Sequence, residues 1–223
     1  MKKTLGILLL LLAALASRAS STNATFTATP GLAVPDANPV GLISTLTVGG
    51  MTGNTINLTV NLDLTGGFNG DLYAYLVSPT GTMVVLLNRV GIGSGHPFGY
   101  GNAGFNITLD SASGNNIHNY QSGSYTLTGG QLTGTWAPDS RTILPNSAPS
   151  AFDLAPTGNT LVNLDGADPN GVWTLFLADL APGGQSTIVS WGLTVMTVPE
   201  PQTWTLLGGS LMAFWMLTRQ RRK

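Results

Sequence analysis

Apolar and polar residues alternate along several short stretches of this chain. The clearest stretch is residues 56–64, where isoleucine, leucine and valine at even positions are separated by asparagine, threonine and aspartate. A period of two predicts a strand with one face in a core and the other in water. Residues 105–109 repeat the pattern, whereas residues 71–77 carry apolar side chains on both faces, which is typical of a central strand.

Turn-forming residues separate the predicted strands. The segment Ser78–Gly81 has the composition of a β-turn and leads into an apolar strand at residues 83–87, so a hairpin is expected here. Toward the C-terminus, the segment "LAPGGQ" lies between strands predicted at residues 172–179 and 188–195. Its proline and glycines indicate a turn, so these last two strands are expected to pair.

The middle of the chain lacks helical periodicity. Between residues 30 and 197, no stretch keeps an apolar period of 3.6 residues with helix caps. Many short strands separated by turns predict an all-β domain over residues 30–197, a β-sandwich, which is a class that includes the jelly rolls. Trp173 and Trp191 fall within predicted strands and are expected in its core.

The N-terminus has the three parts of a secretory signal peptide. Two lysines precede an apolar run at residues 5–15, and small residues follow the run. This order is typical of an exported chain, with cleavage expected after Ala16 or after Ala19. The run is shorter than the roughly 17 residues that a membrane span needs, so residues 1–19 are interpreted as a signal peptide and not as an anchor.

The C-terminus combines an apolar span with a basic end. Residues 202–218 carry no charge and are just long enough for one transmembrane helix. Directly before the span, Pro199, Glu200 and Pro201 favour an extended junction, because proline cannot continue a helix. Four basic residues after the span are expected to stay in the cytoplasm. They are Arg219, Arg221, Arg222 and Lys223.

This order of motif, span and basic end resembles the PEP-CTERM sorting tail of Gram-negative bacteria that make exopolysaccharide. The resemblance covers residues 198–223. It implies that an exosortase, a membrane-embedded cysteine transpeptidase, recognises the tail and removes it. The protein is then expected first as a precursor anchored in the inner membrane and finally at the cell surface or in the extracellular matrix. Without the motif, the same tail would be interpreted as a permanent single-span anchor.

Removal of both ends changes the charge of the chain. The full sequence has nine basic and ten acidic residues, and seven of the basic residues lie in the two terminal segments. Arg89 and Arg141 then remain against nine aspartates, a net charge of −7. Nucleic acid is therefore excluded as a partner, whereas cations are favoured. The absence of cysteine excludes disulfides, thiolate catalysis and the commonest zinc sites.

Three spaced motifs carry a second resemblance. They are "VPDANPVGLISTLTV", "GDLYAYLVSPTGT" and "NGVWTLFLADLAPGGQSTIVSWGLTV". Together they resemble the P-domain (P/Homo B domain) that follows the catalytic domain of kexin- and furin-type proprotein convertases. The resemblance runs from Pro35 to Val195 and implies a jelly-roll sandwich related to galactose-binding-like domains. One departure is the turn Ala181–Gln185, which lacks the acidic residues common in that family.

The sequence has no recognisable catalytic motif. Its two histidines, His96 and His118, lie in glycine- and asparagine-rich segments and are expected to be solvated and not catalytic. The G-x-G-x-x-G pattern at residues 99–104 precedes an alternating strand in place of a helix, so it is not interpreted as a nucleotide site. The protein is predicted not to be an enzyme, and a serine endopeptidase label would be inherited from the P-domain family.

The aspartates suggest a calcium site, because calcium prefers oxygen ligands from carboxylates and loop carbonyls. Some P-domains bind calcium, so the resemblance points the same way. Four aspartates at strand ends or in one loop are predicted to converge at one rim of the sandwich. They are Asp71, Asp110, Asp165 and Asp168. The alternative is that these aspartates cap turns and bond their own backbone.

Three aromatic residues in or near loops are candidates for sugar binding. Exposed rings can cover the apolar face of a sugar while amides and carboxylates bind its hydroxyls. The candidates are Tyr100, Tyr120 and Trp136. The alternative is that these rings close a small core.

Together these observations predict an exported, exosortase-processed, non-catalytic binding module. Its expected ligands are calcium and an extracellular polysaccharide or a surface protein, and it contacts the membrane only through its tail before processing. The alternative function is accessory to proteolysis, in which the domain stabilises or targets a separate serine endopeptidase.

Overall fold

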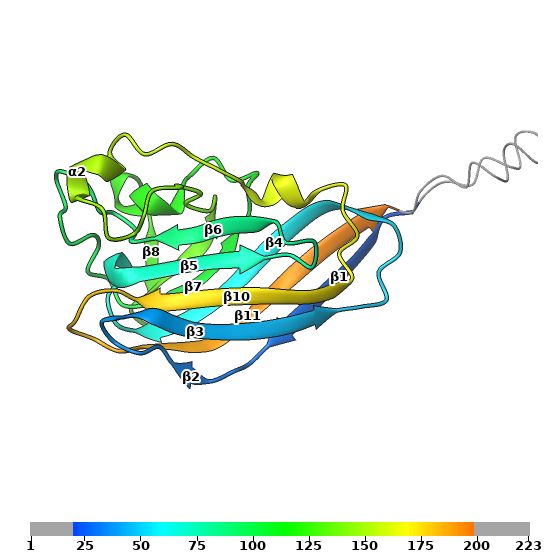
Figure 1. The fold of residues 1–223 in the computed structure, drawn as a ribbon, viewed down its shortest axis with the longest axis horizontal. Coiled ribbons are helices and arrows are strands. Elements are labelled where there is room, and N and C mark those ends of the chain that lie inside the picture. Colours follow the sequence, from blue (N-terminus) through cyan, green and yellow to red (C-terminus); the bar gives the residue numbers. More distant parts are fainter. Residues whose placement is uncertain (1–19, 199–223) are drawn as a thin grey trace, which may run out of the picture. The chain divides into compact units, whose positions relative to one another are not determined.

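The computed structural model describes residues 20–198, and these residues form a mostly β fold (Figure 1). The predicted signal peptide, sorting motif, apolar span and basic end lie outside the described residues. Within residues 20–198, no helix is long and apolar enough to cross a membrane.

The strands of the described region form two sheets. The seven-stranded sheet contains β1 (Thr22–Ala28), β2 (Leu32–Ala33), β4 (Asn54–Gly66), β7 (Phe105–Leu109), β8 (Thr126–Thr128), β9 (Gln131–Trp136) and β11 (Ser186–Val198). The four-stranded sheet contains β3 (Asn38–Val48), β5 (Leu72–Val77), β6 (Met83–Asn88) and β10 (Gly171–Asp179). Short helices connect them: η1 (Asn69–Asp71), η2 (Ile117–Ser122), α2 (Pro149–Phe152) and η3 (Leu161–Leu164).

The strand orders define two layers. In the larger sheet the order is β1-β11-β4-β7-β9-β8, and β2 also pairs with β11. In the smaller sheet the order is β3-β10-β5-β6. Apolar residues of both sheets belong to one core cluster, so the sheets pack face to face. The jelly-roll part of the sequence prediction stays a prediction.

Alternation located the strands correctly. The predicted strands at residues 56–64 and 105–109 are β4 and β7, and the turn after β5 produces the expected antiparallel hairpin with β6. On β4, Leu58 and Leu62 are buried as expected, but Ile56 is 46% exposed. Thr55 is buried in its place and donates its hydroxyl to the carbonyl of Ala167, so the inward face shifts at the start of the strand.

The expected pairing of the last two strands is wrong. β10 lies in the four-stranded sheet between β3 and β5, whereas β11 lies in the seven-stranded sheet between β1 and β4. The Pro- and Gly-rich segment therefore crosses from one layer to the other. This crossing directs Trp173 and Trp191 into the shared core, where both are buried as predicted.

The long polar region between residues 111 and 159 covers the free edge of β6. The amides of Asp139 and Ser140 donate to the carbonyls of Leu86 and Val85 at 3.0 Å each. The side chain of Asn88 donates to the carbonyls of Arg141 and Ile143. Because a bare strand edge invites pairing with other chains, this cover protects one side of the smaller sheet.

Candidate functional site

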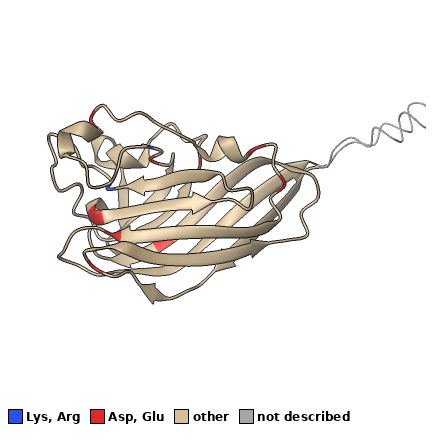
Figure 2. Cartoon of the chain, in the orientation of Figure 1, with Lys and Arg blue, Asp and Glu red and all other residues tan. Residues whose placement is uncertain are grey.

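Three aspartates meet where β10 ends, and we call this group the acidic corner: Asp36, Asp71 and Asp179. Asp179 is the last residue of β10 and is paired with Leu72 of β5 on one side and Asn38 of β3 on the other. Asp71 directly precedes β5, and Asp36 precedes β3 by two residues. The register of three neighbouring strands therefore brings the three carboxylates to one end of the sheet, where Figure 2 shows acidic positions.

Backbone contacts hold the loops of the corner together. The amide of Leu180 donates to the carbonyl of Asp71 at 2.9 Å, and the amide of Gly183 donates to Oδ2 of Asp36 at 3.5 Å. Arg89, which directly follows β6, donates its Nε to the carbonyl of Gly70 at 3.3 Å. The corner is thus built from four separate segments of the chain.

Asp179 is buried without a full set of partners. Its side chain is completely buried, and its Oδ2 accepts no hydrogen bond, while Oδ1 accepts only a 3.4 Å bond from Ala181. Burial raises the pKa of Asp179 to about 6, although the Ala181 amide lowers it, and the charges of Asp71 and Asp36 raise it further. Burial also raises the pKa of Asp71, partly offset by Arg89. A buried carboxylate with an orphan oxygen is costly, and either a proton or a bound cation would offset that cost.

The acidic corner offers oxygen ligands of the kind that calcium prefers. No three His, Asp or Glu side chains of residues 20–198 stand close enough together to hold a metal ion by themselves. A calcium ion here would therefore be held by Asp179 and Asp71 together with loop carbonyls. The orphan oxygen of Asp179 is the structural feature that fits such an ion.

The predicted convergence of four aspartates at one rim is wrong. β10 runs antiparallel to β5, so Asp165 and Asp168, which precede β10, lie at the opposite end of the sheet from Asp71. At about 3.3 Å per residue, the strand separates them by roughly 30 Å.

The other predicted aspartates serve their own loops. Oδ1 of Asp110 accepts the amide of Ala112 at 2.8 Å. Oδ1 of Asp168 accepts both the amide and the side chain of Asn170, at 2.9 and 2.7 Å. Asp165 follows η3, and burial raises its pKa. For Asp110 and Asp168 these contacts fit the turn-capping alternative.

Asp36 and Asp179 were missed by the sequence prediction. Each lies beside a strand end, as Asp71 does, but this signal is shared by most aspartates of the chain. Only the order β3-β10-β5 shows that these three strand ends are neighbours, and local patterns do not carry that order.

The three predicted sugar-binding rings are not exposed. Tyr100, Tyr120 and Trp136 have exposed fractions of 5%, 1% and 6%. Tyr120 contacts both other rings edge to face, with centroids 4.7 Å from Tyr100 and 6.1 Å from Trp136. Burial raises the pKa of Tyr120 to about 12, and its hydroxyl donates to Asn102. The sugar-binding prediction for these rings is wrong, because they close the core.

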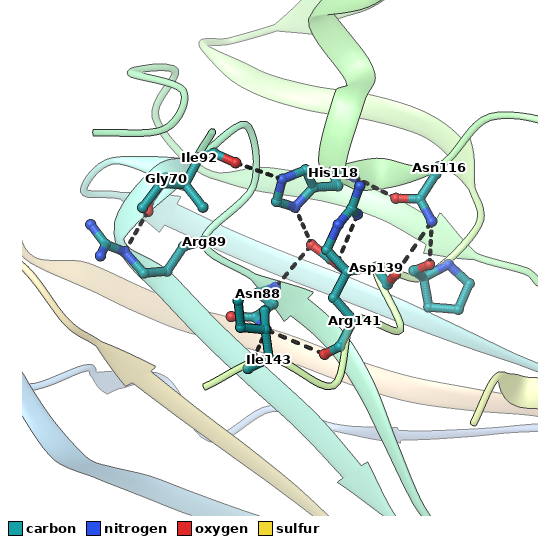
Figure 3. Close-up of polar contacts among 10 residues, drawn as sticks. Gly70, Asn88, Arg89, Ile92, Asn116, His118, Asp139, Arg141 and Ile143 are labelled. Atoms are coloured by element: carbon teal, nitrogen blue, oxygen red, sulfur yellow. Dashed lines mark hydrogen bonds and ion pairs between the residues drawn. The ribbon is translucent and has the colours of Figure 1, made fainter. Parts of the chain in front are cut away.

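His118 belongs to a buried polar network (Figure 3). Its Nδ1 lies 2.6 Å from Oδ2 of Asp139, and its Nε2 donates to the carbonyl of Ile92 at 3.0 Å. Asp139 also accepts from Nη1 of Arg141 and from the amide of Asn88. The expectation of a solvated His118 is therefore wrong, whereas His96 is exposed as expected. Since Nε2 is used by a carbonyl, His118 has no free nitrogen for general-base chemistry.

The described region is thus a two-sheet β domain with one acidic group at the end of β10 and one buried polar network around Asp139. Residues 55–137 match the sequence model of the proprotein convertase P-domain. P-domains are non-catalytic accessory domains. This match spans β4 to β9 and supports the resemblance predicted from the sequence motifs.

Solved structures similar to this chain include two of a bacterial serine protease. The serine protease of Aeromonas sobria is 16% identical with a TM-score of 0.44, and the match covers 80% of this chain and 27% of that one. The same protease in complex with its chaperone, ORF2, is 15% identical with a TM-score of 0.43, covering 85% of this chain and 29% of that one. This chain therefore spans less than a third of either protein. No curated protein gave a match to this chain.

Proposed function

We propose that this protein is an exported, non-catalytic binding module of the cell surface or extracellular matrix, organised by calcium at its acidic corner. The observation that carries the proposal is the orphan Oδ2 of the fully buried Asp179. Calcium would supply the positive charge that this oxygen lacks. Neighbouring loops would then be held together by the ion, as well as by their few backbone contacts.

Thermal unfolding of the purified protein tests the calcium part. A ligand that binds only the folded state stabilises it, and a concentration of about 100 times the Kd adds about 2.7 kcal/mol. For a domain of this size the melting temperature should rise by about 5–10 °C. Asp179→Asn should abolish the rise, whereas the matched control Asp168→Asn should keep it. An equal melting temperature in calcium and in chelator for the wild type would overturn the calcium site.

The proposal of export and sorting is based on the N- and C-terminal sequences. Pro199, Glu200 and Pro201 precede an apolar span and a basic end, as in PEP-CTERM tails. We propose that an exosortase removes this tail and that the mature protein associates with extracellular polysaccharide or a surface protein. Intact mass measurement of the surface-released protein tests this. Glu200→Ala should leave the tail attached, and release of the same shortened protein by this variant would contradict the proposal.

An accessory role in proteolysis is the second candidate, and the P-domain match favours it. In this case the domain would stabilise or target a separate serine endopeptidase. Co-purification of an endopeptidase, with a loss of its thermal stability when this chain is deleted, would support the second candidate over the first. Retention on polysaccharide without any protease partner would support the first.

A further inference from the structure

Exposed aromatic side chains occur beside the acidic corner. Among the Phe, Tyr and Trp side chains of residues 20–198, the exposed ones are Phe68, Phe98 and Tyr125, at 42%, 83% and 40%. Phe68 directly precedes η1, which contains Asp71. Tyr125 belongs to a different segment, just before β8, where its ring contacts Tyr120. Two of the three exposed rings therefore belong to segments at the acidic corner.

Backbone contacts fix Phe98 next to the corner. The amides of Asn69 and Gly70 donate to the carbonyls of Asn102 and Tyr100, each at 2.9 Å. A Cβ added to Gly70 would lie only 2.6 Å from the carbonyl oxygen of Phe98. The backbone of Phe98 is thus packed against the residue that precedes Asp71, while its side chain stays mostly in solvent.

Phe68 contacts the opposite loop of the corner. A Cβ added to Gly183 would lie 3.3 Å from Cε2 of the Phe68 ring. The amide of the same glycine donates to Asp36, whose side chain belongs to an exposed residue. An aromatic ring and a solvent-accessible carboxylate therefore both contact the loop that carries Gly183.

The charges near these rings limit the chemistry of a ligand. The described chain has two arginines and no lysine, and both arginines are engaged. Arg89 donates to the carbonyls of Gly70 and Pro145, and Arg141 pairs with Asp139. No free cationic side chain is left to bind an anionic polymer or lipid surface. A neutral ligand with an apolar face and many hydroxyls fits aromatic rings beside a carboxylate.

We propose that Phe68, Phe98 and Asp36 form a sugar-binding rim for a neutral glycan. The two rings cover apolar faces of sugar units, and the Asp36 carboxylate accepts hydrogen bonds from their hydroxyls. The rim rests on the proposed function, because calcium at Asp71 and Asp179 holds the loops that carry these residues. To the proposed function, the rim adds a recognition site and the class of ligand, a neutral glycan.

Affinity electrophoresis of the purified protein tests the rim. The gels contain a neutral polysaccharide (dextran, galactomannan or arabinogalactan) or acidic alginate, with calcium or with chelator. The wild type should be retarded by at least one neutral polymer in calcium, and Phe98→Ala should weaken this about tenfold, as expected for the loss of a central aromatic contact. Tyr125→Ala is the matched aromatic control and should bind normally, and Phe98→Trp should restore retention.

Calcium-induced thermal stabilisation, measured on the same variants, separates the two proposals. Phe68→Ala and Phe98→Ala should keep the full rise in melting temperature, because neither side chain is a calcium ligand. If both variants bind glycan like the wild type, or if the wild type binds no neutral polymer, the rim is overturned while the calcium site stands. Retention by alginate alone, or capture of a protein through Phe98, would also overturn the neutral-glycan rim. Absence of the calcium-induced rise in the wild type would instead overturn the proposed function.

Discussion

At the scale of single residues, Asp179 and Asp139 show two ways to bury a carboxylate. Asp139 is fully buried and is surrounded by donors from His118, Arg141 and Asn88. Asp179 is equally buried but receives one long bond from Ala181. The arrangement around Asp139 stabilises the fold. Burial of the Asp179 carboxylate costs free energy, which a bound cation can offset.

The titration of Asp179 predicts how stability depends on pH. The pKa of Asp179 is raised from 3.8 to about 6 in the folded state, so the folded chain holds this proton more tightly than the unfolded chain. In chelator, the resulting stability is present below about pH 4 and is lost as the pH rises through about 6. Relative to Asp179→Asn, the wild type should lose free energy of unfolding over this range, measured by urea denaturation. Parallel pH profiles of the two proteins would contradict the assignment.

Removal of Asp139 should be far more damaging. Asp139→Ala leaves the buried His118 and the partly buried Arg141 side chains without their carboxylate partner, which typically costs about 3–5 kcal/mol. Chemical denaturation at neutral pH measures this loss. Asp153→Ala is the control, because Asp153 is exposed and bonds only Ser94, so its loss should be much smaller. Similar losses in the two variants would mean that the network around Asp139 is not a stabilising one.

At the scale of elements, the site depends on the close approach of η1 and the segment around residues 98–102. Gly70 allows it, because a Cβ there would meet the carbonyl of Phe98 and the amide of Tyr100 at 2.6 and 2.7 Å. Gly101 lies in the same segment with open space around it. Substitution of Gly70 therefore tests a position that is in close contact, and substitution of Gly101 tests a position with free space around it.

Gly70→Ala should destabilise the domain by about 1–3 kcal/mol, the usual cost of overpacking. It should also weaken calcium binding, because Asp71 follows directly in the chain. Gly101→Ala should change neither property beyond about 0.5 kcal/mol. Denaturation and calcium titration of both variants check this, and a neutral Gly70→Ala would show that the segments are free to separate.

Element positions were predictable from the sequence, but their partners were not. Alternation at residues 56–64 is a local property that located β4. β10 and β11 lie in different sheets and bury Trp173 and Trp191 in the shared core, an arrangement that no local turn signal reports. For the same reason Asp71 was identified as a candidate ligand, while its neighbours Asp36 and Asp179 were not.

At the scale of the whole molecule, the acidic corner and the two ends of the described domain lie at opposite ends of one strand. β11 has 13 residues and begins at Ser186, just after the loop that closes the corner. At its other end, Thr197 pairs with Thr22 of β1, so both ends of the described domain emerge together. At about 3.3 Å per residue, β11 places roughly 40 Å between these two features.

This separation predicts that the site works before and after tail removal. Because β11 ends at Val198, far along the strand from the acidic corner, we expect calcium and glycan binding to be the same with and without residues 199–223. The precursor with Glu200→Ala and the processed protein should therefore have calcium affinities within about twofold of each other, since no contact at the corner changes. Isothermal titration of both forms measures this. A tenfold weaker affinity in the precursor would mean that the tail reaches the corner, and processing would then activate binding and not merely release the protein.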